Sequence, residues 1–89
     1  MRTPVRSRQF RRDVERAAQR GKDLAKLREL LSLLIGGQAL PARYQDHPLK
    51  GAWKSYRDAH IAPDWLLIYR VVGDELQLVR TGSHTDVFG

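Results

Sequence analysis

One stretch of the chain, residues 65–72, constrains the fold more than any other. Its sequence, WLLIYRVV, is apolar at both odd and even positions. Because side chains alternate between the two faces of a sheet, a strand of this kind must be covered on both faces. The run therefore predicts a central strand, with helices on one face of the sheet and another structure on the opposite face.

The segments around this strand predict the rest of a small sheet. Residues 53–61 alternate in character and form a strand that ends at the turn Ala62-Pro63-Asp64. Gly73-Asp74 is a two-residue hairpin signal, and it leads into a last strand over 75–81. A short strand is also indicated over 3–6, while residues 38–51 are expected to form a loop and 82–89 a mobile tail.

Two amphipathic helices are predicted between the first strand and the loop. Ser7 can cap the first helix, which runs to about Arg20, and Asp23 can cap the second, which runs through Ile35. The apolar faces at helical spacing are Phe10, Val14, Ala17 and Ala18 in the first helix, and Leu24, Leu27, Leu31, Leu34 and Ile35 in the second. Because the link between them is short, the helices should form an antiparallel hairpin.

The predicted fold class is α+β. A single domain over residues 1–89 would contain a small antiparallel sheet with the N-terminal helical hairpin packed on one face, in the order β-α-α-β-β-β. The chain has no cysteine, so it has no disulfide framework and no thiolate metal site. No apolar run reaches the about 18 residues of a membrane span, and no secretory signal is recognisable. We therefore expect a cytoplasmic protein without membrane contact.

Positive charge is concentrated in the first half of the chain. Residues 1–45 contain 11 basic and 4 acidic residues, whereas residues 46–89 contain 5 and 6. Four arginines of the first predicted helix recur at i, i+4 spacing and form one ridge along it: Arg8, Arg12, Arg16 and Arg20. Like charges at this spacing destabilise an isolated helix by about 0.2–0.5 kcal/mol per pair, so helix stability does not explain the ridge. We predict that it binds polyanions, with a solvated face as the alternative.

The chemically reactive side chains lie in the second half. His60 ends one predicted strand, Asp64 precedes the next, and Arg80 ends the last strand at the same edge of the sheet. The tail then brings His84 over that edge, and His47 lies in the preceding loop. Four of these residues should therefore meet at one rim, although each alone also suits a turn, a strand edge or a surface.

Two histidines beside a fixed arginine form a set that suits RNA transesterification. Histidine can give or take a proton at neutral pH, so one group can deprotonate the 2′-hydroxyl while another protonates the leaving 5′-oxygen. The arginine would stabilise the charge that develops on phosphorus. A zinc site is not expected, because the sequence contains no HxxxH or HxH pair.

Three motifs in this half, DHPL, PDWLLIY and RTGSH, occur in order and with natural spacing. Together they closely resemble the YafQ branch of the RelE-like toxins of bacterial toxin–antitoxin systems. The resemblance is nearly continuous from Asp46 to Phe88, whereas the first half of the chain agrees only in pattern. It implies the RelE-like fold and an mRNA endoribonuclease that needs no metal or other cofactor. It also implies that the toxin cuts mRNA in the A site of the 30S ribosomal subunit and is held inactive by a cognate antitoxin protein.

The residues that match the family's active site are His47, His60, Asp64, Trp65, Arg80, His84 and Phe88. The resemblance makes His84 the expected general acid and either Asp64 or His60 the base, with His47 holding a neighbouring group or phosphate. Arg80 would stabilise the phosphorane, and Trp65 and Phe88 would stack on or position the bases. Arg12, Arg16 and Arg20 would dock on ribosomal RNA.

Two other classes of protein fit the same outline. Toxins of the ParE type share this fold, lack the catalytic set and act by binding DNA gyrase. A module of that kind has no need for three histidines, an aspartate and an arginine at one rim. A plain RNA-binding module should display aromatic side chains along a strand face, for which Tyr56 alone is a weak indication.

Overall fold

The computed structural model describes all 89 residues and confirms the α+β class. Its five strands form one sheet in the order β1 (Thr3–Arg6), β5 (Glu75–Gly82), β4 (Trp65–Val72), β3 (Arg57–Ala62) and β2 (His47–Pro48). Three helices and two 3-10 turns complete the fold: α1 (Arg8–Gln19), α2 (Leu24–Ile35), α3 (His84–Phe88), η1 (Ala42–Tyr44) and η2 (Gly51–Trp53). β4 lies in the middle of the sheet, as its two apolar faces predict.

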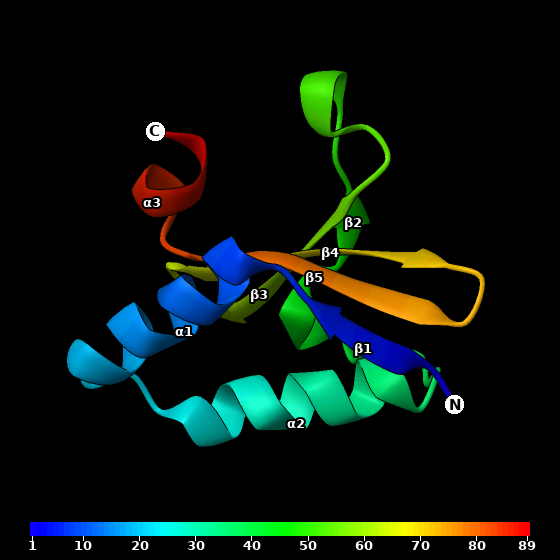
Figure 1. Cartoon of the computed structure of the whole chain (residues 1–89), viewed down its shortest axis with the longest axis horizontal. Helices are drawn as coiled ribbons and strands as arrows, with labels where there is room; N and C mark the ends of the chain where they lie inside the picture. Colours follow the sequence, from blue (N-terminus) through cyan, green and yellow to red (C-terminus); the bar gives the residue numbers. More distant parts are fainter.

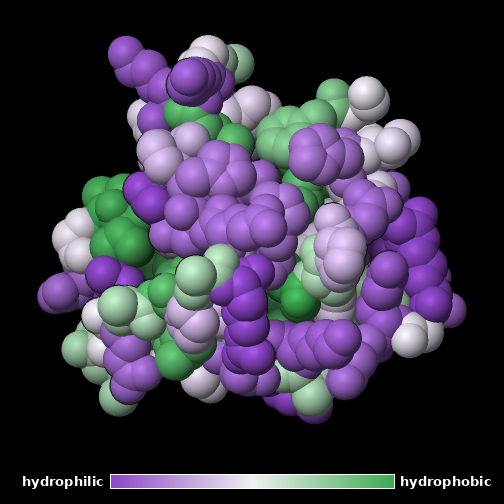
Figure 2. Space-filling view, turned by 180° about the vertical axis from the view of Figure 1, so that it is seen from behind, coloured by the Kyte–Doolittle hydropathy of each residue, from purple (hydrophilic) through white to green (hydrophobic).

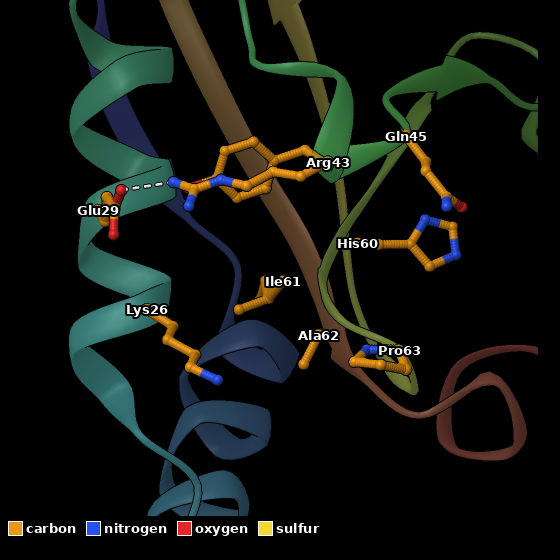
Figure 3. Close-up of a pocket in the computed structure, with 9 residues that line it drawn as sticks. Lys26, Glu29, Arg43, Gln45, His60, Ile61, Ala62 and Pro63 are labelled. Carbon is orange, nitrogen blue, oxygen red and sulfur yellow. Dashed lines mark hydrogen bonds and ion pairs between the residues drawn. The ribbon is translucent and has the colours of Figure 1, made fainter.

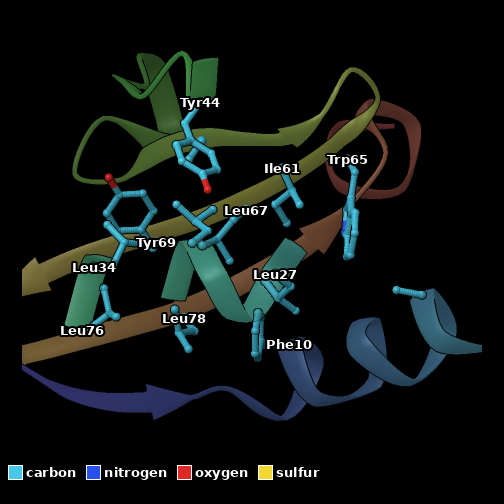
Figure 4. Close-up of a cluster of buried hydrophobic side chains, with 13 residues drawn as sticks. Phe10, Leu27, Leu34, Tyr44, Ile61, Trp65, Leu67, Tyr69, Leu76 and Leu78 are labelled. Atoms are coloured by element: carbon cyan, nitrogen blue, oxygen red, sulfur yellow. The ribbon is translucent and has the colours of Figure 1, made fainter. Parts of the chain in front are cut away.

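The helices α1 and α2 cover one face of the sheet and run in opposite directions (Figure 1). Both begin where the sequence predicts, since Ser7 accepts a hydrogen bond from the Phe10 backbone N–H and Asp23 accepts one from that of Ala25. Figure 4 shows Phe10 and Leu27 of the helices pointing toward the apolar side chains of β4 and β5. This layer is the hydrophobic core of the domain.

The buried face of α1 differs from the prediction at two positions. Ala18 is exposed, whereas Asp13 is buried with its side chain 0% exposed. The carboxylate is satisfied because it accepts hydrogen bonds from Arg80 Nε at 2.8 Å and from the Thr81 backbone N–H at 3.1 Å. Burial alone would raise the pKa of Asp13, but the hydrogen bonds from Arg80 and Gln9 outweigh it and lower that pKa. A charged residue thus joins α1 to β5.

The sheet is mixed rather than purely antiparallel. β3, β4 and β5 are joined by tight turns and are therefore antiparallel, as predicted. β1, however, pairs with β5 in the parallel sense, with Thr3 opposite Glu75. No hairpin joins these two strands, so the turn signals in the sequence did not constrain their relative direction.

The segment before β3 also differs from the predicted strand. Trp53 belongs to η2 rather than to a strand, because Gly51 has a positive φ of 65° and the chain turns back on itself there. This turn allows the two-residue strand β2 to pair with β3, with His47 opposite Asp58. A histidine expected in a loop is therefore fixed at the edge of the sheet.

The predicted mobile tail is a short helix, α3. Ser83 caps it, and a reciprocal hydrogen bond from the Ser83 backbone N–H to the Asp86 carboxylate completes a capping box. Together with η2, α3 lies on the face of the sheet opposite α1 and α2 (Figure 1). The floor of this second face includes Leu66 and Ile68, both 0% exposed.

The view from behind shows a largely hydrophilic surface, on which apolar residues form only small separate patches (Figure 2). No helix combines the length and the apolar character that a membrane crossing requires.

Candidate active site

Three potential proton-transfer groups meet where β2 pairs with β3. The β2–β3 register places His47 opposite Asp58, and His60 follows two positions later on the same face of β3. One ligand atom from each of the three side chains lies within 4.8 Å of the others. The rings of His47 and His60 are stacked with their centroids 6.1 Å apart.

Asp58 lies at the centre of this group and was not among the predicted site residues. Its side chain is only 3% exposed, its Oδ1 has no hydrogen-bond partner, and its Oδ2 is 3.7 Å from His47 Nε2. Burial raises the pKa of Asp58, while His60, His47 and His84, in that order, act in the opposite direction. His47 and His60 therefore lie beside one buried carboxylate.

The sequence contained a signal for Asp58. Asp58 and His60 are spaced i, i+2 within a predicted strand, which places both on one face of the sheet. Their partner, His47, could not be assigned, because a two-residue strand leaves no periodic pattern. Spacing along the chain does not reveal the cluster as a set of metal ligands, since its donors come from two separate strands.

The backbone fixes the orientation of His47. Its Nδ1 lies 2.7 Å from the carbonyl oxygen of Gln45, and a carbonyl can only accept a hydrogen bond. The hydrogen of the neutral ring therefore belongs on Nδ1, which leaves Nε2 unprotonated and directed toward Asp58. Gln45 has φ 48° and ψ 39°, a left-handed conformation that is uncommon for residues other than glycine.

Two members of the predicted rim, Asp64 and His84, meet where the β3–β4 turn contacts α3. The Asp64 carboxylate in the β3–β4 turn accepts a hydrogen bond from the His84 backbone N–H at 3.3 Å. His84 is exposed at the first position of α3, and its ring centroid lies 5.4 Å from that of Phe88. Phe88 in turn meets Trp53 edge-to-face, with 6.0 Å between the centroids. An aromatic contact therefore connects α3 with η2 beside the site.

Arg80 lies on the same face of the sheet as Asp58, but its hydrogen bonds go to other residues. The sheet register places Arg80 opposite Ile68, whose neighbours on that face include Asp58. Its guanidinium donates to Asp13 and to the main-chain oxygen of Asp86, and to none of the histidines. Nη1 makes no hydrogen bond within the protein, so one end of the guanidinium is free to meet an anion.

Trp65 is not positioned as predicted. Its ring is 2% exposed and belongs to the core on the helix side of the sheet. The indole Nε1 donates to the Thr81 hydroxyl at 3.0 Å, and that hydroxyl donates to the Leu66 carbonyl at 2.7 Å. A ring that is buried and hydrogen-bonded in this way offers no free face for a base, so the expectation that Trp65 stacks on RNA is wrong for this structure.

The ridge on α1 is divided between two environments. Arg12 is exposed and forms no ion pair, whereas Arg16 and Arg20 both bind the Asp86 carboxylate of α3. Only the first half of the predicted ridge is therefore free to meet a polyanion.

A cavity of about 570 Å³ lies on the other side of His60. Figure 3 shows it between α2 and the end of β3, with Lys26 and Arg43 near its walls and the His60 ring turned away from it. Arg43 is held there by Glu29, at 2.6 Å. The cavity contains none of the other candidate catalytic side chains, so it is separate from the histidine site.

The chain is similar to known proteins over almost its whole length. Residues 2–89 match the family model described as "Bacterial toxin of type II toxin-antitoxin system, YafQ". The chain is 51% identical over 82 residues to the mRNA interferase toxin YafQ of Escherichia coli strain K12, covering 91% of this chain and 89% of that protein.

Two solved structures are similar over almost the whole chain. One is a crystal structure of the E. coli DinJ–YafQ complex, with a TM-score of 0.93, 49% identity and 100% coverage of both chains. The other is a crystal structure of a metal-bound toxin from Helicobacter pylori, with a TM-score of 0.92, 39% identity and coverage of 99% of this chain and 100% of that one. The match over residues 2–89 and these identities show that the chain belongs to the YafQ family of bacterial toxins of type II toxin–antitoxin systems.

Proposed function

We propose that this toxin is an endoribonuclease that cuts mRNA on the ribosome and so inhibits translation. The observation that carries the proposal is the grouping of His47 and His60 with the buried carboxylate of Asp58, while His84 on α3 contacts Asp64 at the end of β3. A solvated surface gives no reason for such a group, since burying Asp58 without a partner for Oδ1 costs stability. The E. coli relative is named an mRNA interferase, which agrees with this chemistry.

The proposed reaction is an attack by the 2′-hydroxyl on the adjacent phosphorus. A base removes the hydroxyl proton, the P–O5′ bond breaks, and an acid protonates the leaving 5′-oxygen. The products are a 2′,3′-cyclic phosphate and a free 5′-hydroxyl. Each positioned proton-transfer group typically contributes about 10²–10⁴-fold to the rate. No step of this reaction needs a metal ion.

His84 is the proposed acid, because it is exposed on α3 and can approach the leaving oxygen with no rearrangement of the core. His60 is favoured as the base. Its Nδ1 is buried without a partner and its side chain belongs to the cluster with Asp58, whereas the Asp64 carboxylate already accepts a hydrogen bond from the His84 backbone. Asp64 then positions the acid. His47, oriented by Gln45, stabilises the base through Asp58 or binds the phosphate.

The charged and aromatic residues around these groups would bind the RNA. Arg80 presents its free Nη1 toward the phosphorane, and Phe88, 38% exposed, offers a ring on which a base can stack. The exposed Arg12, with Arg8 and Arg11 beside it on α1, would contact ribosomal RNA phosphates in the A site. By analogy with the DinJ–YafQ complex, a cognate antitoxin would bind and inactivate the toxin.

The experiment is cleavage of a defined mRNA on purified ribosomes. The 5′ fragment should carry a 2′,3′-cyclic or 3′-phosphate, and EDTA added to the toxin before mixing should leave the rate unchanged. A 5′-phosphate on the 3′ fragment, or loss of activity of the chelated toxin, would contradict the mechanism. Intact mRNA at all toxin concentrations would instead favour a non-catalytic toxin that binds a protein target.

A second property is favoured by the same cluster of donors. Asp58 Oδ1 and His60 Nδ1 are buried without partners, and two imidazoles with one carboxylate suit Zn²⁺ or Cu²⁺. The similar H. pylori toxin is described as metal-bound. We propose that His47, Asp58 and His60 bind such an ion and that it inhibits the toxin, because it would occupy the groups that transfer protons.

The inhibition can be measured in the same cleavage assay. Micromolar Zn²⁺ or Cu²⁺ should lower the rate, and EDTA should restore it. Isothermal titration of His47→Ala should show weakened binding relative to the unmodified toxin. Unaltered metal affinity in His47→Ala would place the ion elsewhere.

A further inference from the structure

The helix α3 is too short to be stable by itself. It has five residues, whereas isolated helices shorter than about 12–15 residues are marginal in water. Nevertheless it carries both His84 and Phe88 to the site. Val87 is its only buried residue, at 8% exposure, and the edge contact of the half-exposed Phe88 with Trp53 is the other apolar anchor. With so little apolar packing, the position of the proposed acid depends largely on polar contacts.

The strongest of these contacts comes from α1. Arg20 donates from Nη1 to Asp86 Oδ2 at 2.7 Å and from Nη2 to Oδ1 at 3.4 Å, an approach by both ends of the guanidinium. Arg16 Nη1 adds a longer contact to Oδ1 at 3.5 Å. The Arg20 hydrogen bond, together with the Ser83 backbone N–H, holds the pKa of Asp86 well below its usual range. The carboxylate is therefore charged at any pH at which the toxin works.

The contact is continuous with the interior of the protein. Arg16 also binds the buried Asp13 at 2.8 Å, and Arg80 joins Asp13 to the main-chain oxygen of Asp86. The turn before α3 packs closely against the Asp86 side chain. A Cβ at position 82 would lie 2.8 Å from the Asp86 Cβ, so glycine is needed there. A cleft of about 360 Å³ between α1, β5 and α3 is lined by Asp13, Arg16, Arg20, Gly82 and Asp86, among others.

We infer that Asp86 is a positioning residue, whose ion pair with Arg20 fixes α3 against α1 and thereby places the His84 ring for proton transfer. The inference rests on the proposed role of His84 as the acid. It also assigns Arg16 and Arg20 to a different task from Arg12: they hold the catalytic helix, and the ribosome is contacted by the exposed arginines at the start of α1.

The first test compares Asp86→Asn with the unmodified toxin in single-turnover cleavage on ribosomes. Asparagine keeps an oxygen that can accept from the Ser83 N–H but loses the charge that binds Arg20. The maximal rate should fall about tenfold, since a misplacement of 1 Å can cost as much as 10²-fold. The concentration of ribosomes that gives half the maximal rate should be unchanged.

Arg20→Gln should reproduce this pattern. A higher half-saturating concentration with an unchanged maximal rate would overturn the inference, because it would make Arg20 a docking residue. Glu29→Gln is the matched control, since it removes another short and exposed arginine–carboxylate pair, with Arg43, at no cost to either rate or affinity.

The second test asks whether Asp86 acts through His84. In the His84→Ala background, Asp86→Asn should cause no further loss of rate, whereas equal losses in both backgrounds would mean that Asp86 acts by another route. The three histidine ring signals in NMR supply a readout without catalysis. Asp86→Asn should shift or broaden the His84 signal and leave those of His47 and His60 unchanged.

These outcomes separate the inference from the proposed function. A perturbed His84 signal in a toxin whose rate is insensitive to His84→Ala would confirm the anchoring of α3 and refute the acid role of His84. An unperturbed His84 signal with an unchanged rate would refute the anchoring itself.

Discussion

Replacement of His84 by alanine is expected to lower the single-turnover rate of mRNA cleavage on the ribosome by about 10²-fold or more. The leaving 5′-oxygen would then depart without a proton from the protein. Stability should change little, because His84 is exposed and its ring contacts only Phe88 among the aromatic side chains. Chemical quench at saturating ribosomes measures the rate, and urea unfolding measures the free energy of unfolding.

Thr85→Ala is the matched control for this substitution. Thr85 is the next exposed residue of α3, and its hydroxyl takes no part in the proposed chemistry. The control should cleave at the unmodified rate and should arrest growth when expressed without an antitoxin. The His84→Ala toxin should not arrest growth; full toxicity of that variant would remove His84 from the mechanism.

Asp58→Asn is expected to make the toxin more stable and much less active. The buried carboxylate carries its charge with Oδ1 unpaired, and burying a charge costs more than burying a neutral amide of the same shape. Its pKa is raised in the folded state, so its charge opposes folding above the ordinary pKa of an aspartate, and this opposition disappears as the pH falls. The free energy of unfolding should therefore rise at pH 7 and rise by less at pH 4.

Cleavage by Asp58→Asn should fall at least about tenfold, because a neutral amide cannot stabilise a protonated histidine beside it. Urea unfolding at both pH values and single-turnover cleavage measure the two effects. Asp74→Asn, at the exposed β4–β5 turn, should change neither quantity. A variant of Asp58 that is destabilised at pH 7 would show that the carboxylate has a structural partner instead.

The parts of the fold with periodic sequence could be predicted. The caps Ser7 and Asp23, the hairpin turn at Gly73 and the bounds of β4 follow from local rules, and each is found where those rules place it. The parallel partner of β1 and the strand β2 could not, because no turn signal links β1 to β5 and two residues carry no period.

The site was predictable to a similar extent. The rim of Asp64 and His84 followed from strand ends that meet at one edge of the sheet. The contacts of Arg80 and Arg20 depend on a helix in a segment that composition alone marks as mobile. Asp58 was missed because the importance of a buried, unpaired carboxylate appears only when the burial of its neighbours is known.

The central claim is that the RNA supplies its own nucleophile and that the histidines around Asp58 and on α3 move the protons. The most direct measurement uses an mRNA with a single 2′-deoxy sugar immediately 5′ of the scissile phosphate, bound to the ribosome with its codon in the A site. We predict that the toxin binds this complex as it binds the unmodified one and does not cut at that position. Cleavage of the deoxy substrate at a rate close to that of the ribose substrate would contradict the mechanism.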